Sequence, residues 1–99
     1  MGKIDILVIC RHEEILQTIV KLINNNPDWR ATGAVSNEEA LAAFTTQSFK
    51  LVLLGSGIDM DSENKLREAF VTHKPDVIIV QHYGGGSGLL AAEIYQALG

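Results

Sequence analysis

The 99-residue chain has one cysteine, two prolines and no long hydrophobic run, and each scarcity excludes a class of protein. Cys10 cannot form an internal disulfide, which favours a reducing compartment. No segment approaches the roughly 20 apolar residues that span a bilayer, and the first residues lack a signal-peptide pattern. We therefore expect a cytoplasmic protein that makes no membrane contact.

Positive charge is also scarce. The chain has 8 Lys and Arg residues and 12 Asp and Glu residues, which gives a net charge of −4. No basic stripe is present to neutralise phosphates, so nucleic-acid binding is not expected. The hydrophobic fraction of 46% is enough for a continuous core, which excludes a disordered chain. A length of 99 residues predicts a single domain over residues 1–99.

Short apolar segments alternate with segments of helical periodicity along the chain. The predicted strands cover residues 3–10, 29–35, 51–54 and 76–81. The predicted helices cover residues 12–25, 36–47, a segment from Asp61 or Ser62 to the residues before Pro75, and residues 87–98. Ser36 with Glu39 three residues later forms a capping box, which marks the start of the second helix.

This strict alternation predicts an α/β fold with a parallel sheet between two helical layers. Right-handed crossovers restrict the topology, and we expect the strand order 2-1-3-4 of three-layer flavodoxin-like, Rossmann-like folds. The first and last helices should cover one face of the four-stranded sheet, and the second and third helices the other face.

Open parallel sheets bind ligands beyond the carboxyl ends of their strands. The candidate ligand- or anion-binding residues at this edge are Cys10, Arg11, His12, Gly55, Ser56, Gly57, His82, Gly84, Gly85, Gly86 and Ser87. The glycine-rich segment can cradle a phosphate or carboxylate, because free backbone N–H groups and a helix dipole point at it. Alternatively, it is a plain turn in which Ser87 caps the last helix.

Metal and thiol chemistry are weaker hypotheses. Cys10, His12 and His82 lack the paired spacing of a zinc site, so no metal or other cofactor is predicted. Cys10 would be a nucleophile only if Arg11 and the following helix lowered the pKa of its thiol. The alternative, a buried and inert cysteine, is favoured. We predict no catalytic residues.

The order and spacing of the elements resemble the receiver (CheY-like) domain of response regulators. Receivers carry an acidic pair for Mg²⁺ after strand 1, where this chain has Cys10 and Arg11. They carry the phosphoacceptor Asp at the end of strand 3, where Gly55 stands, and a Ser or Thr at the end of strand 4, where Gln81 or His82 stands. The resemblance therefore implies a degenerate pseudo-receiver without aspartyl phosphorylation.

A second resemblance is to the IIB domains of sugar phosphotransferase systems. These have a similar size and a four-stranded parallel sheet, and they are phosphorylated on a cysteine at the end of strand 1, where Cys10 stands. Their next loop is rich in Gly, Ser and Thr, whereas this chain has Arg11, His12 and two glutamates. Arg11 could attract a phosphoryl group, but the carboxylates would repel it.

The fourth strand is as apolar as a central strand, although the predicted order places it at a border. Such an edge favours pairing with another chain, so we expect a homodimer or a protein partner at this strand and the last helix. The leading hypothesis is a non-catalytic receiver-like domain in signal transduction that acts through protein contacts. The alternative is a small protein that handles an anion or phosphate, such as a phosphocysteine carrier.

Overall fold

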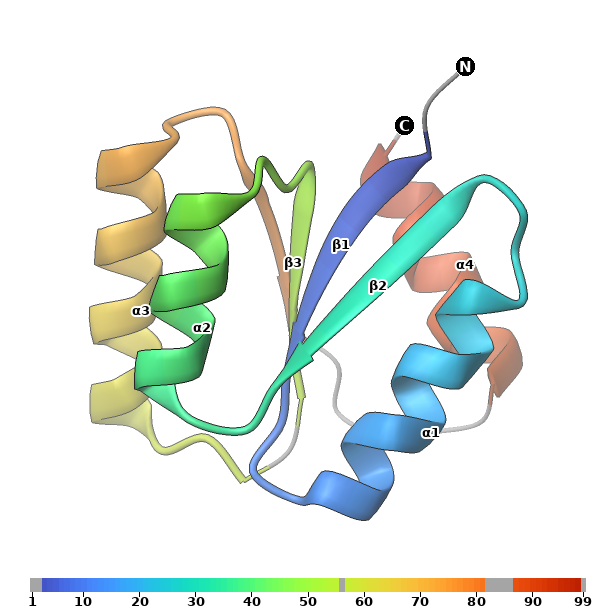
Figure 1. Cartoon of the computed structure of the whole chain (residues 1–99), viewed down its shortest axis with the longest axis horizontal. Helices are drawn as coiled ribbons and strands as arrows, with labels where there is room; N and C mark the ends of the chain where they lie inside the picture. Colours follow the sequence, from blue (N-terminus) through green and yellow to red (C-terminus); the bar gives the residue numbers. More distant parts are fainter. Residues whose placement is uncertain (1–2, 56, 82–86, 99) are drawn as a thin grey trace.

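The computed structural model describes residues 3–55, 57–81 and 87–98, in which four strands alternate with four helices (Figure 1). The elements in chain order are β1 (Ile4–Ile9), α1 (Glu13–Asn24), β2 (Trp29–Ala34), α2 (Asn37–Thr46), β3 (Leu51–Leu54), α3 (Met60–His73), β4 (Ile78–Gln81) and α4 (Ser87–Leu98).

All strand pairs are parallel, and the order is β2-β1-β3-β4, which confirms the predicted topology. β1 lies inside the sheet, where Ile6 pairs with Ala31 of β2 on one side and with Leu51 of β3 on the other. β3 and the Ile6–Ile9 part of β1 read as continuous apolar runs because both of their faces are covered. β2 and β4 form the two edges of the sheet.

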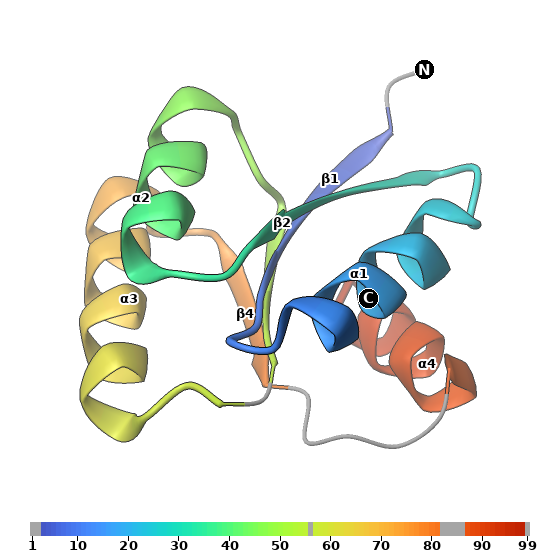
Figure 2. The same cartoon turned by 60° about the horizontal axis from the view of Figure 1, so that its bottom comes forward.

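Two cores pack on opposite faces of the sheet, because successive strand side chains point in opposite directions. Ile6 and Val8 pack with residues of α1 and with Ile94 of α4 on one face. Leu7 and Ile9 pack with residues of α2 and α3 on the other face. Figure 2 shows the sheet between these helix pairs, and the predicted layering of two helices per face is confirmed.

Contacts near the end of α1 place α4 beside it. The Tyr95 ring of α4 packs on Trp29, with 4.7 Å between ring centroids, and the Asn26 amide donates a 2.8 Å hydrogen bond to the Tyr95 hydroxyl. Trp29 is therefore a core residue that anchors α4, whereas Tyr95 keeps its outer side exposed.

The predicted capping box at the start of α2 is confirmed. The Glu39 N–H donates a hydrogen bond to the Ser36 hydroxyl over 3.1 Å, and the Val35 N–H donates to the Glu39 carboxylate over 2.9 Å. The first bond satisfies a backbone donor that the first helical turn leaves unpaired, and the second binds the N–H of the residue before the N-cap.

Some predicted boundaries were wrong by a few residues. α3 begins at Met60 with Asp59 as its N-cap residue, before the predicted Asp61 or Ser62. β4 begins at Ile78 rather than Asp76, because the Val77 N–H closes a turn onto the Lys74 carbonyl over 3.0 Å. Among the described residues, no helix is long and apolar enough to cross a membrane.

Candidate functional site

The structure brings the segments after β1 and β3 into contact at the carboxyl end of the sheet. A Cβ atom placed on Gly55 would lie 3.0 Å from the Cys10 Cβ, and one on Gly57 would lie 2.8 Å from the Arg11 Cβ and 3.2 Å from the His12 Nε2. The predicted candidates Cys10, Arg11, His12, Gly55 and Gly57 therefore form one cluster.

The remaining candidates are not all described. Ser56, His82, Gly84, Gly85 and Gly86 lie outside the described residues. Ser87 is the first residue of α4, and its side chain also lies outside the described part. The predicted anion cradle at this glycine-rich segment stays a prediction.

Gly55 is closely packed. Its backbone N–H donates a 2.6 Å hydrogen bond to the Ile9 carbonyl oxygen, and an added Cβ would lie 3.0 Å from that same oxygen. Backbone atoms of a central strand move aside only at a cost to the sheet. Close packing therefore favours glycine at the end of β3.

Gly57 needs glycine for another reason as well. Its φ of +85° lies in the left-handed region, which side chains rarely adopt, and its missing side chain lets Arg11 pack against the backbone. This turn brings the loop after β3 over the loop after β1.

Arg11 joins the segment after β1 to the segment between β2 and α2. Its guanidinium donates a 3.0 Å hydrogen bond to the Val35 carbonyl oxygen and a second hydrogen bond to the Asn37 side-chain oxygen. The Asn37 amide in turn donates to the Ser62 hydroxyl over 3.2 Å. Asn37 and Ser62 were not predicted to belong to the site, because they lie 26 and 51 residues beyond Arg11 and carry no local signal of this contact.

Asp59 supplies a negative charge near this arrangement. A hydrogen bond with the Ser62 side chain lowers the pKa of the Asp59 carboxyl below its usual value, and the positive charge of Arg11 contributes in the same direction. Asp59 thus stays ionised at neutral pH. The positive charge of Arg11 and the negative charge of Asp59 therefore flank the polar contacts of Asn37 and Ser62.

A second polar bridge holds the end of β4. The Gln81 amide donates a 2.6 Å hydrogen bond to Glu63 of α3, and the other Glu63 oxygen accepts from Arg67 over 3.0 Å. Gln81 was considered in the sequence only as the counterpart of a receiver Ser or Thr. In the structure it ties β4 to α3.

Cys10 is fully buried at the end of β1. Its Sγ lies 3.6 Å from the His12 carbonyl oxygen, within range of a weak S–H donor. A thiol in this position is inaccessible to a substrate unless the loops open. Among the described residues, no group of three or more His, Cys, Asp and Glu side chains is arranged to hold a metal ion.

Known structures share the fold of this chain. A response regulator receiver domain from Clostridium thermocellum matches with a TM-score of 0.79 and 18% identity, over 96% of this chain and 94% of the other. The signal receiver domain of an HD domain-containing protein from Pseudomonas fluorescens Pf-5 matches with a TM-score of 0.72 and 18% identity, over 96% of this chain and 75% of the other. This chain has the receiver fold.

A receiver protein from Pseudomonas putida is similar to the same degree, with a TM-score of 0.72 and 15% identity over 98% of this chain and 81% of the other. No protein-family model and no curated protein sequence matches the chain. The likeness to receivers therefore lies in the fold, as the sequence resemblance predicted.

Proposed function

We propose that this chain is a receiver-fold signalling domain that acts through protein contacts and does not accept a phosphoryl group on aspartate. The observation that carries this proposal is the packing at Gly55. Receivers place the phosphoacceptor Asp at the end of the third strand, and here Gly55 follows β3, with the Ile9 carbonyl oxygen and the Cys10 Cβ each 3.0 Å from where a Cβ would lie.

The charge at the end of β1 supports the same proposal. Receivers hold Mg²⁺ with an acidic pair at this point, whereas Arg11 brings a fixed positive charge. Two cations a few ångströms apart repel each other strongly in a partly buried site. Hydrogen bonds to Val35 and Asn37 keep the guanidinium there, so Arg11 opposes cation binding.

The polar bridges support a binding role with a fixed shape. Contacts from Arg11 join the segments after β1 and β2, Asn37 and Ser62 extend them to α3, and Gln81 joins β4 to α3. A surface whose loops are held together loses little conformational freedom when a partner binds, which favours association. We infer a domain that presents one constant surface to its partner.

The test is incubation with acetyl phosphate and Mg²⁺, followed by intact-mass measurement. We expect no covalent phosphate on the wild-type chain or on Cys10→Ser, while a receiver domain with a phosphoacceptor Asp, treated in parallel, gains one. Phosphorylation of both the wild type and Cys10→Ser would contradict the proposal. Phosphorylation that disappears in Cys10→Ser would instead support the phosphocysteine carrier.

The geometry does not favour that carrier. A phosphocysteine needs its sulfur exposed to the donor, whereas the Cys10 side chain is buried beneath the segments that contain His12 and Gly55. A thiol reagent should therefore react with Cys10 slowly in the folded protein and rapidly after addition of denaturant.

A further inference from the structure

An open groove runs between α1 and the β2 edge of the sheet, and its volume is about 750 Å³. Leu16, Val20 and Val35 supply apolar side chains to its lining, and Gly33 supplies backbone. Small-molecule sites in proteins have volumes of roughly 300–1,000 Å³ and a mostly apolar lining with a few polar groups. This α1–β2 groove therefore has the size and lining of a site for a small ligand.

Alternate residues of β2 turn their backbone groups away from the sheet. The Ala34 carbonyl accepts a 3.1 Å hydrogen bond from the Cys10 N–H, so the even-numbered residues of β2 face β1. In a parallel ladder, the odd-numbered residues then point outward. Gly33 is one of these outward residues, and it presents its backbone to the groove.

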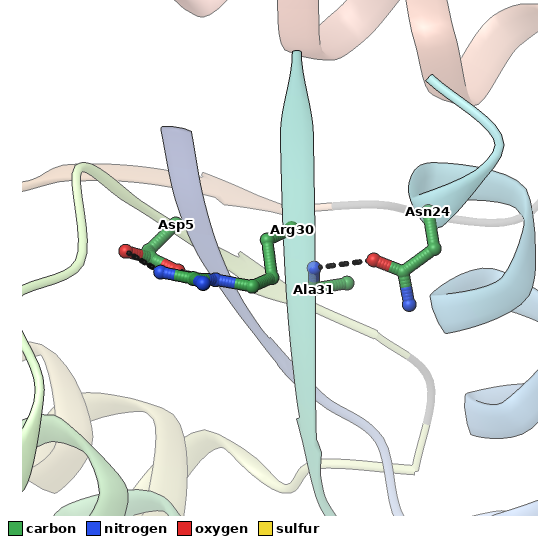
Figure 3. Close-up of polar contacts among 4 residues, drawn as sticks. All are labelled: Asp5, Asn24, Arg30 and Ala31. Carbon is green, nitrogen blue, oxygen red and sulfur yellow. Dashed lines mark hydrogen bonds and ion pairs between the residues drawn. The ribbon is translucent and has the colours of Figure 1, made fainter. Parts of the chain in front are cut away.

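Side chains cover the outward N–H groups on both sides of Gly33. The Ala31 N–H donates a 2.8 Å hydrogen bond to the Asn24 side chain (Figure 3), and the Val35 N–H donates to the Glu39 carboxylate over 2.9 Å. Within the part of the chain that the structure describes, no hydrogen bond reaches the Gly33 N–H. This edge thus leaves one residue for a ligand to pair with, and a longer strand would have to displace Asn24 or Glu39.

The two ends of the groove carry opposite charge. Glu13 at the start of α1 and Glu39 at the start of α2 line the end where β2 finishes, whereas Lys21 in the last turn of α1 lines the other end. Among the described residues, Lys21 forms no ion pair. A complementary ligand carries a cation at the glutamate end and an anion at the lysine end.

Two arginines near β2 have other partners. Arg30 lies on the opposite face of the strand, where it forms a 2.7 Å salt bridge with Asp5 (Figure 3). Arg11 binds the Val35 carbonyl beyond the glutamate end and does not line the groove. The lining itself therefore has two carboxylates at one end and one ammonium group at the other.

We propose that the α1–β2 groove binds a free peptide of about three residues, extended and antiparallel to β2. The middle residue of the peptide pairs with Gly33, because opposed residues of an antiparallel pair can exchange two backbone hydrogen bonds. The peptide amino group lies at Glu13 and Glu39, and its carboxylate lies at Lys21. This ligand site goes beyond the function proposed above and is separate from the cluster at Gly55.

Length is the reason to name a short peptide as the occupant. Glu13 and Lys21 are eight positions apart on α1, which corresponds to about 12 Å along the helix axis. Three extended residues span about 10 Å, and the two long side chains reach over the remaining distance. An internal segment of a longer protein would continue past Asn24 and Glu39 and compete with their hydrogen bonds to β2.

The middle residue of the peptide should be apolar. Opposed residues of an antiparallel pair place their side chains on the same face of the sheet. For Gly33 that is the face covered by α1, because an added Cβ would lie 3.2 Å from carbon atoms of the Leu16 side chain. An apolar middle side chain can therefore pack on Leu16 and Val20, whereas the two outer side chains point to the opposite face.

NMR titration with the peptide Ala-Leu-Ala tests the site. The amide signals of Gly33, Leu16 and Val20 should shift together, with a dissociation constant of about 1 mM, because one amide pair and exposed ion pairs contribute modestly. Salt should weaken binding, because it screens exposed ion pairs. Ala-Gly-Ala lacks the apolar middle side chain and should bind at least about threefold more weakly.

Charge variants test the polarity of the groove. Lys21→Glu should raise the dissociation constant at least about threefold, because it replaces attraction to the peptide carboxylate by repulsion. Lys65→Glu makes the same change on the exposed side of α3 and should leave binding unchanged. Glu13→Gln should also weaken binding, whereas Glu14→Gln, at the next position of α1 and outside the lining, should not.

A peptide with blocked ends separates the proposal from its alternative. Acetyl-Ala-Leu-Ala-amide has no terminal charges and should bind more weakly than the free peptide. Equal affinity would overturn the proposal and favour an internal segment of a protein as the occupant. No shift of the Gly33 signal at about 20 mM peptide, or equal affinity of the wild type and Lys21→Glu, would also overturn it. None of these results bears on aspartyl phosphorylation, which the acetyl phosphate experiment tests separately.

Discussion

The Arg11 guanidinium donates a hydrogen bond to the Val35 backbone carbonyl over 3.0 Å, and so joins the segment after β1 to the segment after β2, 24 residues further along the chain. Its second hydrogen bond reaches the Asn37 side chain at the start of α2. Arg11, which the sequence presents as a candidate anion ligand, therefore has a structural role.

Replacing Arg11 should destabilise the fold. Arg11→Met leaves the Val35 carbonyl and the Asn37 amide oxygen without their charged donor, and should lower the free energy of unfolding by about 1–3 kcal/mol. Arg30→Met is the matched control and should cost less than Arg11→Met, because the Arg30 side chain is 64% exposed and its salt bridge is screened by solvent. Urea denaturation measures both, and equal losses would contradict the structural role of Arg11.

Adding a side chain at Gly55 should destabilise the fold, whereas adding one at Gly33 should be tolerated. Gly55→Ala presses a Cβ against the Ile9 carbonyl and should cost about 1–3 kcal/mol, as overpacking does. Gly33→Ala meets carbon atoms of the Leu16 side chain at 3.2 Å, and its three nearest atoms include no backbone atom, so the adjustment falls on a side chain. Melting temperatures should fall clearly for the first variant and change little for the second, whereas similar values would refute the packing argument.

Asn24 should protect the edge of β2. Asn24→Ala removes the acceptor of the Ala31 N–H and should cost about 0.5–1.5 kcal/mol. Exchange of the Ala31 amide hydrogen should become faster, as NMR would show. Asn25→Ala changes the neighbouring residue in the same way and serves as the control. If both variants leave the Ala31 amide equally protected, the Asn24 contact is not what protects it.

Asp59 should contribute to the pH dependence of stability. Its pKa in the folded state lies below the unfolded value of about 3.9, so its stabilising effect is present at neutral pH and is lost as the pH falls through the folded pKa. The stability difference between the wild type and Asp59→Asn should therefore shrink below about pH 4. Salt should reduce this difference, because the carboxylate is exposed, and a difference that grows in acid would have the wrong sign.

The fold was predictable because it depends on patterns that recur along the chain. The apolar segment at Ile4 alternates with the helical periodicity that follows it, and the remaining elements repeat this order. Parallel strands and right-handed crossovers then leave few topologies. The capping box of Ser36 and Glu39 was equally predictable, because both partners lie within one helical turn.

The site was predictable only in part. The sequence identified Cys10, Arg11 and Gly55 through their places at strand ends. It did not indicate that Arg11 would bind Val35 and Asn37, because such contacts depend on how distant loops meet. Local periodicity carries no information on these pairings.

The same limit applies at the edges of the sheet. In sequence, an asparagine at the end of a helix, such as Asn24 in the run before Pro27, indicates only that the helix stops. Only the packing of α1 along β2 brings the Asn24 amide to the Ala31 N–H. The protection of β2 was therefore not predictable, although its position at an edge was.

The Asn24 and Glu39 contacts also bear on how the chain avoids aggregation. The N–H groups of Ala31 and Val35 at the β2 edge are already bound to their own chain. A strand from another molecule could extend the sheet at this edge only by breaking those bonds, which protects the β2 side from the open-ended stacking that leads other exposed sheets to fibres.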